Sequence, residues 1–315
     1  MKRINDLNND SLIEQQINKI LDHLCEPKSY KSVYHRSNHA VPMPSIEDLQ
    51  EVMELIRSVL FPGYFGNSDV KPVTMKYYLG AAINRIFIIL SEQIKRGFCF
   101  SCVEGDNACC DECEDRSRNI TQQFLNQLPH LRSILSVDIN AAYQGDPAAN
   151  SVSEVIFCYP TISALIHYRI AHALHKLDVP IIPRIITEMA HSATGIDIHP
   201  GAVIGESLFI DHGTGVVIGE TCIIGCNVRI YQGVTLGAKS FPLDSDGQPI
   251  KGIPRHPIVE DDVIIYSGAT ILGRVTIGQG SVIGGNVWLT KDVPPGTRIL
   301  QSKATESIFE QGAGI

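Results

Sequence analysis

An apolar residue recurs every six positions through the second half of the chain, and this period constrains the fold more than any other feature. The series runs without a miss from Ile198 to Val234 and restarts at Val263. From Val216 onward a second apolar series follows two positions later. A period of six does not fit the 3.6-residue turn of an α-helix, but it is typical of a β-helix, in which each hexad forms one short strand and a turn. Three hexads close one triangular coil, so equivalent residues are expected about eighteen positions apart, with their apolar side chains stacked into a continuous interior.

One segment interrupts the hexads: GAKSFPLDSDGQPIKGIPRHP, which is rich in Gly, Pro and Asp. Because these residues favour turns, the segment predicts a loop at about 238–257 that is extruded from the coil. A β-sandwich is the alternative for a strand-rich segment, but sandwich strands do not keep one phase across their turns. We therefore expect a parallel β-helix with an extruded loop.

The first half of the chain has helical spacing instead. Helices are predicted over residues 10–24, 45–60, 75–94, 117–142 and 161–178, with the third apolar on nearly all sides and therefore buried. Ser45 with Asp48 three positions later is a capping-box pattern at a helix start. The predicted fold class is α+β: an all-helical N-terminal domain at 1–192, the β-helix at 193–296 and a C-terminal tail at 297–315.

The net charge and the hydropathy pattern of the chain exclude several classes of binding partner. The 315 residues carry a formal net charge of -8, with no basic run longer than two residues, so nucleic acid and anionic membrane surfaces are not expected as partners. No stretch of eighteen apolar residues is present, and the N-terminus lacks the apolar region of a secretory signal. A small molecule or a protein is the expected partner, and the expected location is cytoplasmic.

Four of the nine cysteines form two CxxC pairs within a Cys-rich insertion at 97–116. Cysteines of a cytoplasmic chain are mostly reduced, and this spacing suits a tetrahedral structural zinc. The candidate ligands are Cys99, Cys102, Cys110 and Cys113. The neighbouring acidic residues are equally compatible with a solvated insertion between helices, so both interpretations stay open.

Asp211 and His212 stand in the middle of the hexads, where apolar and small residues are the rule. Asp197 precedes His212 by about one coil, so we expect the two side chains on neighbouring rungs roughly 5 Å apart. A carboxylate that accepts the proton of one imidazole nitrogen fixes the tautomer and leaves the other nitrogen free as a base. A solvated turn is the alternative role for such a pair.

The motifs GIDIHPGAVIGESLFIDHGTGVVIGET, VTLG, RHP, SGATILG and VPPGT, together with GDPAA and YRIAH in the helical part, resemble serine O-acetyltransferase of the hexapeptide-repeat acyltransferase family. The resemblance covers about residues 140–296. It implies a left-handed coil, a helical N-terminal domain, and active sites between neighbouring subunits of a homotrimer or of a dimer of trimers. The implied reaction transfers an acetyl group from acetyl-CoA to the hydroxyl of L-serine, giving O-acetyl-L-serine for cysteine biosynthesis.

The resemblance also implies residue roles. His212 is similar to the general base and Asp197 to its orienting carboxylate. Asp146 and Asp211 resemble the groups that receive the substrate ammonium, and Arg255 and His256 resemble those that hold its carboxylate. Acetyl-CoA is expected in a groove beside Gly237, Gly268 and Ala269, although glycine and alanine are also needed for the turns themselves. The segment RILQSKATES departs from the family after VPPGT, which leaves Lys291 and Arg298 as candidate contacts for the CoA phosphates.

The tail EQGAGI ends at Ile315, and a free carboxylate beside one apolar side chain can dock into an amino-acid site. In the family, such a tail binds O-acetylserine sulfhydrylase. Three functions are alternatives to serine O-acetyltransferase activity. They are another hexapeptide-repeat acetyltransferase, a γ-type carbonic anhydrase with His199, His212 and His256 as zinc ligands, and a binding module without catalysis.

Overall fold

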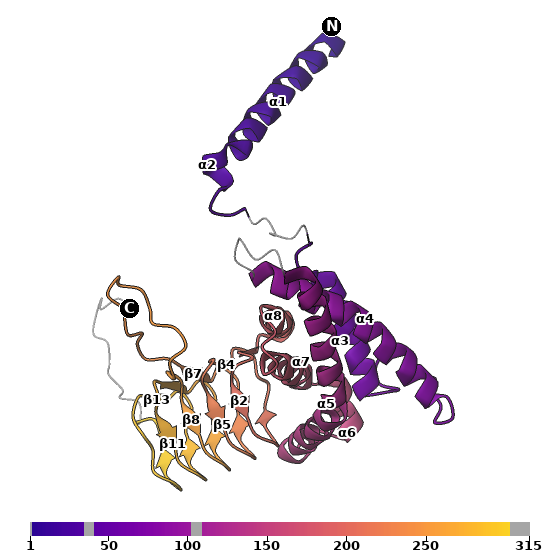
Figure 1. Ribbon diagram of the computed structural model, residues 1–315. Coiled ribbons are helices and arrows are strands. Elements are labelled where there is room, and N and C mark those ends of the chain that lie inside the picture. Colours follow the sequence, from indigo (N-terminus) through magenta and orange to yellow (C-terminus); the bar gives the residue numbers. More distant parts are fainter. Residues whose placement is uncertain (1, 35–40, 102–108, 303–315) are drawn as a thin grey trace, which may run out of the picture.

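A computed structural model describes residues 2–34, 41–101 and 109–302, with side chains described at 13–34, 41–101 and 112–302. Within these residues all helices precede all strands (Figure 1). The helices are α1 (Lys2–Cys25), α2 (Pro27–Tyr30), α3 (Ile46–Leu60), α4 (Met75–Ser101), α5 (Cys109–Gly145), α6 (Val152–Cys158), α7 (Pro160–His175) and α8 (Ile182–Thr194). The predicted α+β class, helices followed by a left-handed parallel β-helix with an extruded loop, is confirmed.

Three parallel sheets form the three faces of the coil. The first contains β1 (Asp197–Ile198), β4 (Val217–Ile218), β7 (Thr235–Gly237), β10 (Thr270–Leu272) and β13 (Trp288–Leu289). The second contains β2 (Val203–Ile204), β5 (Ile223–Ile224), β8 (Ile258–Val259) and β11 (Thr276–Ile277). The third contains β3 (Phe209–Ile210), β6 (Arg229–Ile230), β9 (Ile264–Ile265), β12 (Val282–Ile283) and β14 (Arg298–Ile299). The last strand lies beyond residue 296, where the sequence placed the start of the tail.

The expected spacing of eighteen residues holds for the regular coils, where Ile218 pairs with Leu236 and Ile271 with Leu289. The first coil is longer, because Ile198 pairs with Ile218 twenty positions on. Its two additional residues lie between β3 and β4, at the corner formed by residues 211–216. The unbroken count of six from Ile198 to Val216 therefore hides a change of phase, which is a correction to the sequence interpretation.

The extruded loop leaves the coil between β7 and β8, as predicted. Leu236 pairs with Ile271 thirty-five positions on, so the stack continues across the loop without a missing rung. The backbone keeps the loop outside the coil, and residues 239–252 are exposed. The buried columns on either side thus fix both ends of the loop.

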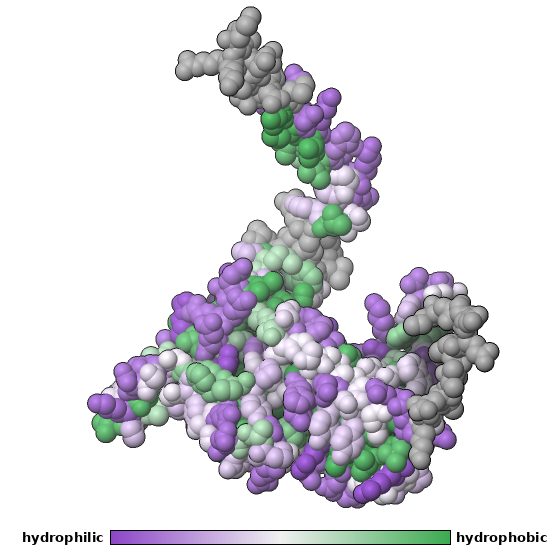
Figure 2. Space-filling view, turned by 180° about the vertical axis from the view of Figure 1, so that it is seen from behind, coloured by the Kyte–Doolittle hydropathy of each residue, from purple (hydrophilic) through white to green (hydrophobic). Residues whose placement is uncertain are grey.

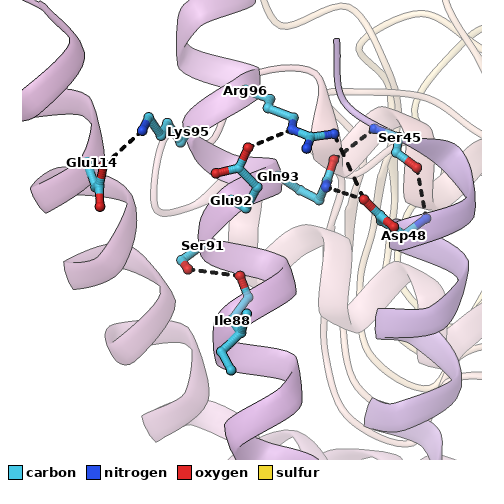
Figure 3. A network of polar contacts seen from close by, with 9 residues as sticks. All are labelled: Ser45, Asp48, Ile88, Ser91, Glu92, Gln93, Lys95, Arg96 and Glu114. Atoms are coloured by element: carbon cyan, nitrogen blue, oxygen red, sulfur yellow. Dashed lines mark hydrogen bonds and ion pairs between the residues drawn. The ribbon is translucent and has the colours of Figure 1, made fainter. Parts of the chain in front are cut away.

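The predicted helix cap at Ser45 is confirmed, and it is part of a larger network (Figure 3). Ser45 Oγ accepts a hydrogen bond from the Asp48 N–H at 3.0 Å. The fully buried Gln93 of α4 accepts from the Ser45 N–H at 2.8 Å and donates to Asp48 Oδ2 at 2.7 Å. Both ends of a buried amide are therefore satisfied, which joins α3 to α4. The helix α4 is less buried than predicted, since Ile83 and Ile88 are exposed.

The helix α1 projects away from the other helices, and an apolar stripe on it faces solvent (Figures 1 and 2). The stripe comprises Ile13, Ile17, Ile20, Leu21 and Leu24, each about half exposed. The amphipathic pattern predicted this helix correctly, but the stripe packs on no core within the described part of the chain. No helix in that part is both long enough and apolar enough to cross a membrane.

The Cys-rich insertion is more helical than predicted. Cys99 lies near the end of α4, and Cys110 and Cys113 lie in the first turns of α5. Cys99 and Cys113 are buried, while Cys102 and the side chain of Cys110 fall outside the described residues. Cys99, Cys110 and Cys113 therefore belong to two helix ends.

One buried ion pair joins the helical part to the coil. Arg169 of α7 donates to both oxygens of Asp138 on α5 at 3.1–3.2 Å, and both side chains are at most 5% exposed. The same guanidinium donates at 2.6 Å to the carbonyl oxygens of Ile204 and Gly205, and Asp138 accepts from the Leu208 N–H at 3.0 Å. Two helices and the first coil thus share one network.

We predict that Asp138→Asn strongly destabilises the fold, because it leaves a buried guanidinium without its counter-ion, a loss of about 3–5 kcal/mol. The midpoint of urea unfolding, followed by circular dichroism, measures the effect. Arg85→Ala removes the exposed Arg85–Glu51 pair and is the matched control, expected to leave the midpoint almost unchanged. Equal midpoints for Asp138→Asn and the parent chain would contradict this account.

Candidate active site

The predicted site residues gather at two different corners of the triangular coil. The first, the His212 corner, consists of residues 211–216 between the third and first sheets, together with Asp146 and Tyr159 from the helical part. The second, the His256 corner, consists of residues 219–222 between the first and second sheets, together with Arg255 and His256 from the end of the extruded loop. Each corner carries its own chemistry.

The His212 corner is the two-residue expansion of the first coil. The Asp211 N–H donates to the Ile230 carbonyl at 2.8 Å, which keeps Asp211 on its rung. His212 and Gly213 both have positive φ, 57° and 84°, as do residues at other corners of the coil. The His212 side chain is 72% exposed, and its Nδ1 lies 3.8 Å from Asp211 Oδ1. The imidazole is thus free to meet a substrate.

Asp146 reaches the same corner from the GDPAA turn after α5. Its Oδ1 accepts from the Ala148 N–H at 2.8 Å, and its Oδ2 accepts from the Tyr159 hydroxyl at 2.5 Å. The Tyr159 hydrogen bond is the main cause that lowers the pKa of Asp146, and the charge of His212 adds to it. The same bond raises the pKa of Tyr159 to about 12. Asp146 and Asp211 therefore form an anionic corner suited to an ammonium group.

Asp197 is not bonded to His212 within one chain. It begins β1, where it pairs with Val217, and neither a hydrogen bond nor an ion pair joins it to the imidazole. The register places Asp197 opposite Val217, while His212 lies in the added segment of the first coil, so a contact between Asp197 and His212 stays a prediction. The carboxylate instead lies beside Glu188 and His191, with ligand atoms within 4.8 Å of one another.

His256 is held in one orientation at the second corner. Its ring is 7% exposed, and Nδ1 accepts hydrogen bonds from the Thr221 N–H at 3.1 Å and the Thr221 hydroxyl at 2.9 Å. Burial, followed by the charge of Arg255, lowers the pKa of His256 to about 4. At neutral pH the ring is therefore uncharged, and its Nε2–H is available as a donor.

Arg255 provides the positive charge of this corner. Its Nη2 donates to Glu220 Oε2 at 2.6 Å. Burial opposes ionisation of Glu220, but the hydrogen bond and charge of Arg255 prevail and lower the pKa of that carboxyl. Arg274 braces the arrangement from the next coil, because its Nη1 donates to the carbonyl oxygens of Thr221 at 2.6 Å and His256 at 3.0 Å. An arginine and a neutral imidazole donor suit a carboxylate.

The residues expected beside acetyl-CoA have structural roles in the coil. Ala269 is fully buried, so its side chain belongs to the interior column of the coil. Gly268 has a φ of 69°, and a Cβ there would lie 2.4 Å from Asn286 Oδ1. Gly237 ends β7, where the loop begins.

The alternative metal sites gain no support from the described residues. His199 lies near the His256 corner and His212 at the other, so the three proposed histidine ligands do not converge within the chain. Glu188, His191 and Asp197 form the group of metal-ligating side chains found in the described part, and no such group there includes Cys99 or Cys113. The zinc site of the Cys-rich insertion stays a prediction.

Comparison with known proteins agrees with this arrangement. The family model for bacterial transferase hexapeptide (six repeats) matches residues 256–291. A plasmid-encoded serine acetyltransferase of Synechococcus elongatus is 51% identical over 281 residues, which cover 89% of this chain and 88% of the relative. The chain belongs to the serine acetyltransferase family.

Solved structures of serine acetyltransferases share the fold. Isoform 3 from Entamoeba histolytica, in complex with cysteine, aligns with a TM-score of 0.68 and 34% identity over 83% of this chain and 84% of that one. The soybean serine acetyltransferase complexed with serine aligns with a TM-score of 0.52 and 30% identity over 83% of this chain and 99% of that one. The ligands of those two proteins are therefore small amino acids.

Four residues of the site were missed by sequence reasoning: Tyr159, Glu220, Thr221 and Arg274. Tyr159 carries no motif signal, and its partner Asp146 lies thirteen positions away. The coil register could have found Thr221, because it lies thirty-five positions before His256, the same offset that pairs Ile223 with Ile258 across the loop. Counting rungs is therefore a better guide to such partners than motif matching.

We predict that Gly219→Ala disrupts the His256 corner. A Cβ at this position would lie 2.1 Å from His256 Cδ2 and 2.2 Å from Nε2, so the ring must leave its place, and overpacking of this kind costs about 1–3 kcal/mol. The KM for L-serine, measured by thiol release from acetyl-CoA, should rise by about tenfold. Gly80→Ala, on α4 with no atom within 4 Å, is the control and should retain the parent kinetics. An unchanged KM in Gly219→Ala would refute the tight packing of this ring.

Proposed function

We propose that the chain transfers the acetyl group of acetyl-CoA to the hydroxyl of L-serine, as its family membership implies, and that it does so in the cytoplasm. The observation that carries the proposal is the division of charge between the two corners. Asp146 and Asp211 offer carboxylates to an ammonium group, whereas Arg255 and His256 offer donors to a carboxylate. Free L-serine carries one group of each kind on its Cα atom, and its hydroxyl is on the side chain of the same atom.

His212 acts as the general base. Its exposed imidazole takes the hydroxyl proton as the serine oxygen attacks the thioester carbon, which contributes about 10²–10⁴-fold to the rate. The tetrahedral intermediate then collapses, the carbon–sulfur bond breaks, and the departing thiolate takes the proton from the imidazolium. Attack is direct, so no acyl-enzyme is formed. Fixing both charged ends of serine aligns its oxygen with the thioester and removes part of the entropic barrier.

Each complete site combines the His212 corner of one subunit with the His256 corner of its neighbour in a homotrimer. Support comes from the separation of the two corners on one coil, which leaves each half-site without its complement. Asp197 lies on β1, where it pairs with Val217, and no hydrogen bond or ion pair joins it to His212 of its own chain. In such a trimer Asp197 orients His212 of the partner subunit.

Acetyl-CoA binds as the co-substrate along the groove between neighbouring coils. Gly237 at the start of the extruded loop leaves room for the pantetheine arm, while Lys291 and the exposed Arg298 on β14 supply positive charge for the phosphates. The C-terminal Ile315 lies outside the described residues, and we propose it as the binding element for O-acetylserine sulfhydrylase. Assembly of two trimers into a hexamer is compatible with the same catalytic unit.

We predict that the parent chain releases CoA thiol with L-serine but not with homoserine or a sugar nucleotide, and that His212→Ala lowers kcat by about 10²–10⁴-fold because the base is lost. The thiol-release assay measures both. His130→Ala, which removes an exposed histidine on α5, is the control and should retain parent activity. Near-normal turnover by a folded His212→Ala variant would contradict the assignment of the base.

A subunit-mixing experiment tests the shared site. His212→Ala and His256→Ala variants are each expected to be inactive, but random mixed trimers recover activity, because about a quarter of their interfaces combine two intact corners. Activity after co-expression of the two variants is the measurement. Co-expression of His212→Ala with Asp211→Ala, which damages the same corner twice, should restore nothing. If the first mixture also stays inactive, each site lies within one chain.

A further inference from the structure

The hydroxyl of Thr221 forms all the hydrogen bonds of which it is capable, and every partner lies at the end of the extruded loop. A threonine hydroxyl has one donor and two acceptor positions. Thr221 Oγ1 accepts from the Arg255 N–H at 2.9 Å and from the His256 N–H at 3.1 Å. The remaining bond joins the hydroxyl to His256 Nδ1 at 2.9 Å. With both acceptor positions occupied by N–H donors, the hydroxyl donates its own proton to the ring.

We propose that Thr221 is a positioning residue for substrate binding: it fixes the place of Arg255 and the tautomer of His256, so that the two form a preorganised receptor for the carboxylate of L-serine. The inference rests on the proposed function, because it concerns the same site. It adds a residue that touches no substrate itself and acts through its two neighbours.

The tautomer argument depends on two donors that meet at one nitrogen. Both the N–H and the hydroxyl of Thr221 point at His256 Nδ1, which can accept them only with a lone pair. The single proton of the neutral ring is therefore placed on Nε2, where it can donate to an anion. A proton on Nδ1 would face two donors and lose both bonds. The hydroxyl of Thr221 thus selects the tautomer that a carboxylate needs.

The backbone argument concerns the free length of the loop. Residues 239–252 are exposed, so nothing in that stretch packs Arg255 against the coil. Thr221 anchors the first residues that return to the stack, and Arg274 holds the carbonyl oxygens of Thr221 and His256 together from the following coil. Without the hydroxyl, two adjacent backbone N–H groups lose their acceptor at the point where the loop ends. Ordering them again on binding would weaken the affinity for serine.

Thr221→Val tests the proposal, because valine keeps the branched shape and removes only the hydroxyl. The loss of these bonds should raise the KM for L-serine, and the calorimetric dissociation constant for L-serine, by about tenfold or more. The KM for acetyl-CoA should change less than twofold. Thr221→Ser retains the oxygen and is expected to restore both serine constants to within about twofold of the parent values.

Matched controls separate positioning from general damage. Thr121→Val removes the hydroxyl of a buried threonine that bonds only to the Ser117 carbonyl of its own helix, and it should leave both serine constants unchanged. Thermal unfolding and the oligomeric mass are recorded for each variant. If Thr221→Val does not fold, Thr221→Ala removes the same hydroxyl with a smaller side chain.

Two results would overturn the proposal: a folded Thr221→Val or Thr221→Ala variant with the parent's affinity for serine, or a Thr221→Ser variant that fails to recover it. An equal rise in the constants for serine and acetyl-CoA would also count against it, because that result indicates general loosening. A parent chain that neither binds L-serine nor releases thiol with it refutes the proposed function instead, and the role of Thr221 falls with it.

Discussion

A single buried guanidinium determines how the helical part and the coil meet. Arg169 is tolerated in the interior only because Asp138 and two carbonyl oxygens of the coil surround it with acceptors, and a buried charge that lost any of them would be costly. The network therefore fixes α5 and α7 against the first coil. Those helices also carry the two flanks of the site: Asp146 follows α5, and Tyr159 precedes α7. The position of the helical carboxylate beside His212 is a consequence of this contact.

The candidate catalytic and serine-binding residues of the β-helix lie in the coils that are longer than eighteen residues. A regular coil of eighteen residues has no residues left for a functional site, since its apolar side chains fill the interior and its corners are short turns. The first coil departs from this length by two residues, and they carry the exposed imidazole of His212. The coil that contains the loop departs by many more, and its returning end carries Arg255 and His256. A stacked scaffold thus supplies rigidity, while insertions at its corners supply the reactive groups.

Features set by local rules were predictable from the sequence. The hexad period identified the coil and the loop, and Ser45 with Asp48 identified a helix start. Residue contacts that depend on the strand register could not be predicted from the sequence. Val216 continued the count of six although it belongs to an enlarged corner, so the count did not reveal that Asp197 pairs with Val217. The burial of the Ala269 side chain was likewise not predicted, because composition alone cannot tell an interior position from a groove position.

The separation of the two corners also has an electrostatic reason. If Arg255 were adjacent to Asp146 and Asp211 within one chain, its guanidinium would pair with those carboxylates and block the binding of substrate. Placed at another corner, it is held by Glu220 through one of its five N–H donors, which leaves others for an incoming carboxylate. In the homotrimer that we propose, the anionic and cationic halves meet across a subunit boundary, with a zwitterion between them. Binding of a free amino acid thereby neutralises both halves at once, whereas a ligand with only one of the two charges would leave the other half unpaired.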